Sequence, residues 1–222
     1  MGLPQRAARL TPAEYLKIER AAEIRHEYFN GEMFAMSGGS PHHSLIKMNA
    51  GGELRTQLKG RPCTAFDSDL RIQISPTGLY TYPDISVVCG ELEFDDDQRD
   101  TVLNPTLLVE VLSDSTEAYD RGKKFEHYRR IDSLREYVLI SQKSPTIERY
   151  LRNPDHTWTL TAVIGLDASI HLPTIDVTLS LAEVYDRVTF DDPNSLRPGD
   201  VLTDSLSQPV GSTTRPSLRP PS

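Results

Sequence analysis

Two nearly continuous apolar runs constrain the fold most, because each carries a single carboxylate. They read "YPDISVVCG" over residues 82–90 and "TLLVEVLS" over residues 106–113, with Asp84 in the first and Glu110 in the second. Apolar runs of this length, rich in β-branched residues, are typical of strands that are covered on both faces. Helical patterns flank them, so the sequence predicts an α/β domain with a mixed central sheet and helices on its faces.

Glu110 lies within its run, so it needs a partner in the folded chain. Side chains alternate along a strand, which places Glu110 on the face opposite its two valine neighbours. A buried, unpaired carboxylate costs several kcal/mol or takes up a proton. We therefore expect a base, a cation or a metal ion beside Glu110. A structural ion pair with Arg71 or Lys124 is the simpler alternative.

Asp84 stands at the start of its strand, directly after Pro83, where an aspartate commonly forms a turn or cap. If the two strands are neighbours, its carboxylate reaches the same cation as Glu110. Two carboxylates, with water and substrate oxygens in the remaining positions, are the usual ligands of Mg²⁺. A bound Mg²⁺ lowers the pKa of its water and clamps a phosphoryl oxygen.

The segment "YDRGKKFEHYRR" over residues 119–130 predicts a helix after the second strand. Asp120, Lys124 and Tyr128 are spaced four apart and share one face of that helix. A lysine close to a metal-bound water can orient it, or stabilise charge that develops on a phosphate. A solvated pair between Lys124 and Asp120 is the alternative that suits a lone lysine on an amphipathic helix.

The remaining elements are marked by caps, turns and periodicity. Thr11 and Pro12 open a helix over roughly residues 12–22, and Asn30-Gly31 predicts a two-residue hairpin turn. Further elements are predicted as a helix after Ser40-Pro41, a strand within 63–75, a buried strand at 135–142, a hairpin over 146–163 and a short helix within 179–188. These elements place one domain over residues 10–190, and the Pro- and Ser-rich residues 191–222 predict a disordered tail.

Charge and cysteine content restrict the function classes. The net charge of −8 argues against a broad basic face that grips nucleic acid, but it allows an enzyme that holds a phosphodiester through a metal ion. Cys63 and Cys89 lack CxxC spacing, so we expect both to be reduced, in a cytoplasmic protein. No apolar run approaches the roughly 18 residues that cross a bilayer, so we expect no membrane partner.

Seven segments together resemble the Uma2 family, a branch of the PD-(D/E)XK nuclease superfamily. They are, in order, "TPAEYL", "EYFNGEMFAMSG", "PHHSLIKMN", "YPDISVVCG", "VEVLSDST", "YDRGKKFEHYRRI" and "REYVLI". The resemblance covers about residues 10–190. It implies a restriction-endonuclease-like fold, with an N-terminal helix and hairpin. It also implies hydrolysis of a DNA phosphodiester that depends on Mg²⁺, for which Mn²⁺ can substitute.

The resemblance also implies roles for particular residues. Asp84 and Glu110 would be metal ligands, joined by the backbone carbonyl of Val111. Leu112 stands where the superfamily pattern has a lysine, and Lys124 matches the position on the following helix where Uma2-like sequences place it instead. Glu32, as an outer acid, and His43, as a substrate or water contact, also match family positions. From the residues themselves, Asp67 and Asp69 lie two apart and so share one face of their strand, where Asp69 would support the site. Asp120 and Tyr128, on the helix face of Lys124, would lie beside it.

Two other functions are compatible with the same residues. A catalytically silent module could keep the fold and bind nucleic acid or a protein partner. A metal phosphohydrolase could act on nucleotides instead of DNA. For the nuclease, DNA is the expected partner, and a homodimer is plausible because two sites related by a two-fold axis cut two strands most simply.

Overall fold

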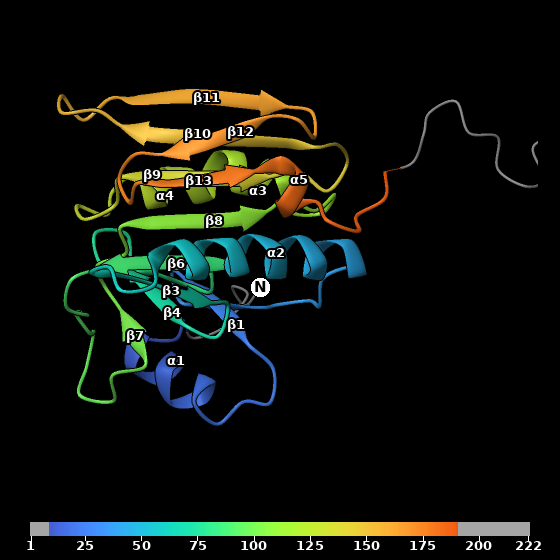
Figure 1. The fold of residues 1–222 in the computed structure, drawn as a ribbon. Helices are drawn as coiled ribbons and strands as arrows, with labels where there is room; N and C mark the ends of the chain where they lie inside the picture. Colours follow the sequence, from blue (N-terminus) through green and yellow to red (C-terminus); the bar gives the residue numbers. More distant parts are fainter. Residues whose placement is uncertain (1–8, 191–222) are drawn as a thin grey trace, which may run out of the picture. The chain divides into compact units, whose positions relative to one another are not determined.

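A computed structural model describes residues 9–190, and the tail predicted for residues 191–222 lies outside the described part of the chain. The domain is mixed α/β, as predicted, and its centre is a six-stranded sheet (Figure 1). β8 and β9 pair in parallel and the other neighbours pair antiparallel. In sheet order the strands are β11 (Trp158–Ile164), β10 (Thr146–Arg152), β9 (Glu136–Ile140), β8 (Leu107–Val111), β6 (Ile85–Cys89) and β3 (Cys63–Asp67).

One face of this sheet is covered by a long helix and a small hairpin (Figure 1). The covering elements are α2 (Pro41–Leu58), β12 (Ser169–Leu172), β13 (Val177–Ser180) and α5 (Leu181–Val184). α2 continues through Gly51-Gly52, since Ile46, Ala50 and Leu54 are fully buried against the sheet and offset the low helix propensity of glycine. The β12–β13 hairpin on this face was not predicted from the sequence.

The opposite face packs against a second, five-stranded sheet. Its strands, in sheet order, are β2 (Glu32–Ala35), β1 (His26–Phe29), β5 (Leu79–Thr81), β4 (Arg71–Ile74) and β7 (Thr101–Val102). The predicted hairpin turn is confirmed, with positive φ at both Asn30 and Gly31. The predicted N-terminal helix is α1 (Pro12–Glu19), and Thr11 and Glu14 form a capping box at its start.

Two predicted elements have a different form in the structure. The strand expected within residues 63–75 is two strands, β3 and β4, which belong to different sheets because the chain turns between Asp67 and Arg71. The helix expected at residues 119–130 is α3 (Glu117–Tyr119), a π-helix η1 (Asp120–Lys124) and α4 (Phe125–Tyr128) in succession. Single π-helical turns often occur at functional sites.

The expectation that both cysteines are reduced is wrong in this structure. Cys63 and Cys89 occupy opposite positions in the antiparallel strands β3 and β6, and they form a disulfide. Their separation of 26 residues gives no sign of this pairing, because it arises from the register of the two strands. Among the helices of residues 9–190, none combines the length and the apolar character required to cross a lipid bilayer.

Candidate functional site

Glu110 lies in β8 on the face of the central sheet that is turned away from α2. Lys124 from η1 places its Nζ 2.8 Å from Glu110 Oε1, and the hydroxyl of Tyr128 donates a hydrogen bond of 2.7 Å to the same oxygen. Glu110 is 4% exposed and Lys124 is 6% exposed. The carboxylate therefore has the cationic partner that its buried position required, while the other candidate, Arg71, pairs with Asp100 instead.

Lys124 faces two further carboxylates. Its Nζ lies 3.4 Å from Glu27 Oε1 in β1 and 3.5 Å from Asp120 Oδ1, one turn earlier in η1. Glu27 also accepts a hydrogen bond from the hydroxyl of Thr81 in β5. One buried cation is thus shared by three acids from three elements.

The sequence pattern did not identify Glu27 as a site residue. In an isolated hairpin the alternation of side chains would leave it in solvent. Its position inside the cluster results from the packing of the five-stranded sheet against the central sheet, which no local pattern encodes. The only signal was an acid within a short strand rich in aromatic residues, "HEYF".

Asp84 directly precedes β6 and lies next to the end of β8, since these strands are neighbours. Its Oδ2 accepts the N–H of Val111 at 2.8 Å and lies 3.1 Å from Nε2 of His43. His43 is in the first turn of α2, where Ser40 caps the helix. The backbone N–H of Asp84 points toward Glu110 Oε2 at 3.4 Å. The two acids therefore stand side by side at adjacent strands.

The structure brings most of the predicted residues together, but it leaves two outside. Glu32 is exposed on β2, on the strand next to the one that carries Glu27. Asp69 is exposed and pairs with Arg25, because the chain has already left β3 at this point. Val111 contacts the cluster through its backbone N–H, which donates to Asp84.

Burial and the neighbouring charges together set the pKa values of the cluster. Burial raises the pKa of Glu110 to about 8, helped by the charges of Asp120 and Asp84 and opposed by Lys124. Burial also raises the pKa of Asp120. For Lys124, burial acts to lower the pKa, but the three carboxylates outweigh it and hold the pKa well above its ordinary value. The surrounding carboxylates therefore favour the charged ammonium form of Lys124.

A divalent metal ion such as Mg²⁺ would need several oxygen donors around one point. Residues 9–190 contain no group of three or more His, Cys, Asp or Glu side chains arranged to hold one. Asp84 and Glu110 nevertheless each engage one oxygen strongly, Oδ2 and Oε1, and turn the second toward fewer partners. Two carboxylate oxygens suit Mg²⁺ or Mn²⁺, which prefer oxygen ligands and keep several waters. The residues present therefore fit such an ion.

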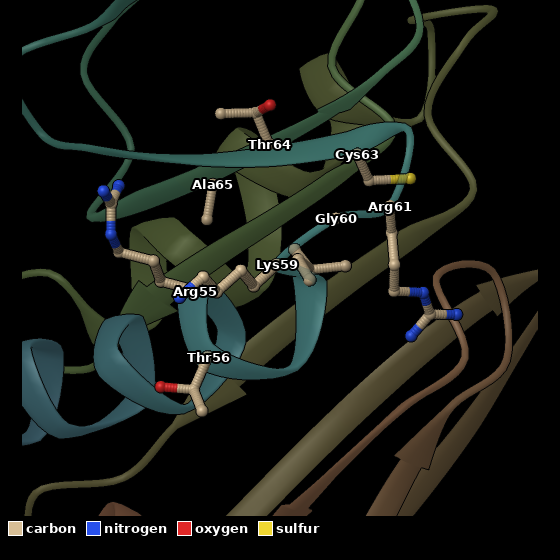
Figure 2. Close-up of a pocket in the computed structure, with 9 residues that line it drawn as sticks. Arg55, Thr56, Lys59, Gly60, Arg61, Cys63, Thr64 and Ala65 are labelled. Carbon is tan, nitrogen blue, oxygen red and sulfur yellow. The ribbon is translucent and has the colours of Figure 1, made fainter.

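A hollow of about 500 Å³ lies at the other end of α2, where the chain turns into β3 (Figure 2). Its lining includes Arg55, Lys59 and Arg61, and Cys63 of the disulfide borders it. Arg61 is already bonded to Asp176. None of the residues of the buried charge cluster lines this hollow, so the two features are separate.

The Uma2 family, described as "putative restriction endonuclease", matches residues 12–182. The chain belongs to this family. Two uncharacterized proteins of Synechocystis sp. are similar to it: slr1290 is 39% identical over 82% of this chain and 94% of its own length, and sll1609 is 37% identical over 72% and 91%.

A solved structure shares the fold. The crystal structure of "a putative nuclease belonging to DUF820" from Anabaena variabilis matches with a TM-score of 0.65 and 21% identity, over 79% of this chain and 97% of that one. Family membership supports a nuclease-type function for the chain.

Proposed function

We propose that the chain is an endonuclease that hydrolyses phosphodiester bonds of DNA and depends on Mg²⁺, with Mn²⁺ as a substitute. One observation carries the proposal most directly. Asp84 and Glu110 stand together on adjacent strands, with the ammonium group of Lys124 2.8 Å from Glu110. Two acids and a lysine in one place are the groups that hydrolysis of a phosphodiester requires, and family membership points to the same chemistry.

Asp84 and Glu110 would hold the metal ion, with the Val111 carbonyl as a further oxygen donor. When bound, such an ion supplies an activated water and a positive charge beside the phosphate. His43 and the N–H of Val111 fix the orientation of the Asp84 carboxylate through its Oδ2. Tyr128 and Lys124 fix Glu110 through its Oε1. Most contacts of each ligand therefore fall on one oxygen, while Glu110 Oε2 receives only the N–H of Asp84.

Lys124 would act as a charge rather than as a base. Its raised pKa keeps it protonated, since three acids surround it. A protonated lysine cannot remove a proton from water, but it stabilises negative charge as that charge develops on the phosphate in the transition state. Glu27 and Asp120 contribute by holding the ammonium group in place.

The proposal is tested by plasmid cleavage with purified protein in the presence of Mg²⁺, Mn²⁺ or neither. The wild type should nick or linearise the plasmid only with metal. Glu110→Gln and Asp84→Asn preserve shape and should lower the rate by at least about 100-fold, since each removes a charged ligand. Glu32→Gln is the matched control, because Glu32 is exposed outside the cluster, and it should cut like the wild type.

Absence of cleavage of duplex, single-stranded and branched DNA with either metal, by protein that is shown to be folded, would reject the proposal. Hydrolysis of mononucleotides but not of DNA would assign the cluster to a nucleotide phosphohydrolase instead.

One observation favours a silent binding module: Lys124 already satisfies Glu110, as in a closed structural ion pair. Calorimetry distinguishes the two functions. The nuclease should bind Mg²⁺ and lose this binding in Asp84→Asn, whereas a silent module should show no Mg²⁺ binding that depends on Asp84.

A further inference from the structure

The outer edge of β11 is unusual for a protein that stays monomeric. β11 (Trp158–Ile164) is the last strand of the central sheet, and within residues 9–190 no strand pairs with its outer side (Figure 1). Edge strands are normally protected from association by charged residues, proline or a bulge. The sequence of β11, "WTLTAVI", contains no charge and no proline, and its register with β10 runs without interruption over seven pairs.

The backbone of β11 presents a regular set of free donors and acceptors at this edge. Asn153 donates to Thr157, and Gly165 donates to Pro145, so the odd-numbered residues of this strand bond to β10. In an antiparallel pair the intervening residues direct their N–H and C=O groups the other way. The outward-directed residues are therefore Trp158, Leu160, Ala162 and Ile164.

The same four residues project their side chains on one face of the sheet. Leu160 is 50% exposed and Ile164 is 73% exposed, while Trp158 packs against Phe125 at a ring distance of 5.3 Å. The edge thus combines unpaired backbone groups with exposed apolar side chains. Each of these features favours contact with another strand.

We propose that two copies of this chain associate through β11, with the two strands antiparallel and a two-fold axis at Thr161. In this register Trp158 lies opposite Ile164 of the second copy, and Leu160 lies opposite Ala162 of the second copy. Each such pair joins two residues whose backbone groups point outward, so both can exchange N–H···O bonds. Every exposed apolar side chain also meets an apolar side chain, as cross-strand packing requires.

Charge disfavours contact between two copies at the β2 and β3 edges but does not oppose it at β11. The chain carries a net charge of −8, so two copies repel each other over most of their surfaces. β11 is an uncharged segment of that surface. The edge strand of the other sheet, β2, begins with the exposed Glu32, and the opposite edge of the central sheet, β3, ends at the exposed Asp67. The dimer joins two six-stranded sheets into one continuous sheet.

The interface lies three strands away from β8 and its Glu110, so the proposal does not rest on nuclease activity. Sedimentation analysis of the full chain should give twice the chain mass of 24.9 kDa. Ala162→Pro should give the monomer mass with the fold intact, because the Ala162 N–H faces outward and its loss breaks no bond to β10. Leu160→Lys should also give the monomer, since it adds a charge at the interface.

The matched control is Phe34→Lys on the edge strand β2. The exposed fraction of Phe34, 49%, nearly equals that of Leu160. Phe34→Lys should remain a dimer. A wild type that is monomeric at tens of micromolar would overturn the proposal. So would an Ala162→Pro variant that is still dimeric, because the interface would then lie elsewhere.

Cysteine cross-linking tests the register itself. In the proposed dimer the two copies of Thr161 form a pair without hydrogen bonds, with Cα atoms about 4.5 Å apart, a separation that a disulfide spans. Thr161→Cys should therefore form a covalent dimer on oxidation, while both native cysteines are occupied by their own disulfide. Thr159→Cys places the two cysteines four residues out of register and should not. Equal cross-linking by both variants would contradict the register.

Discussion

Glu136 is a buried acid that the proposed chemistry does not use, and it yields a prediction about stability. It is fully buried in β9, where its Oε2 accepts the N–H of Thr174. Its Oε1 has no hydrogen-bond partner among the described residues, and the closest cation, Arg149 Nε, is 4.0 Å away. Burial therefore raises the pKa of Glu136 to about 7.

The raised pKa of Glu136 sets the direction and the size of the change in stability with pH. The folded chain binds this proton more tightly than the unfolded chain, whose pKa is the ordinary 4.5. The stabilising contribution of protonated Glu136 is complete below pH 4.5 and is lost as the pH rises to about 7 and above. The difference between the two pKa values corresponds to a loss of about 3 kcal/mol in the free energy of unfolding.

Glu136→Gln removes this titration while keeping the shape of the side chain. It should raise the free energy of unfolding by up to about 3 kcal/mol at pH 8.5 and by less than about 1 kcal/mol at pH 5. Urea denaturation at the two pH values measures both differences, and exposed Glu126→Gln is the control that should change neither. An equal effect of Glu136→Gln at both pH values would refute the reasoning, since it would show that the carboxylate is not the group that titrates.

Three further predictions concern the charge cluster and the disulfide. Lys124→Met should lower the free energy of unfolding by about 3–5 kcal/mol, because it leaves the buried Glu110 and Asp120 and the half-buried Glu27 without their cation, and urea denaturation measures this. Mg²⁺ affinity, measured by calorimetry, should rise with pH and level off above about 8, since the ion must displace the proton of Glu110, whose pKa is raised to about 8. Reduction of the disulfide should cost about 3 kcal/mol of stability, given a closed loop of 26 residues, and denaturation with and without reductant measures it.

The sequence predicts those parts of the site that follow from a single strand or helix. An acid inside the apolar run "LLVEV" requires a partner wherever the strand is buried, so Glu110 was identifiable without a structure. Lys124 and Asp120 were identifiable by helical spacing, which the π-helix alters without separating them. The hairpin at Asn30-Gly31 was predictable because Asn and Gly readily adopt the positive φ that the turn requires.

The sequence does not predict contacts that depend on how sheets pack or which strands are neighbours. Glu27 joins the cluster only because a second sheet lies on the first, and Cys63 meets Cys89 only through strand register. Asp69 shows the converse error: its spacing from Asp67 implied one strand, but a turn between them directs Asp69 to Arg25 at the surface. Tertiary contacts of this kind have no local periodicity, so pattern reading cannot supply them.

The charge balance of the cluster connects its stability to its proposed chemistry. Glu27, Glu110 and Asp120 surround one ammonium group, and Asp84 adds a fourth acid beside Glu110. One ammonium group does not balance four carboxylates, so the cluster favours an additional proton or cation. A proton on Glu110 is one source, consistent with its raised pKa of about 8, and the divalent cation of the proposed function, held by Glu110 and Asp84, would be the other. The two sources compete for the same carboxylate. A purely structural ion pair needs one acid for its base, whereas the metal site that we propose would use the additional acids as anionic ligands.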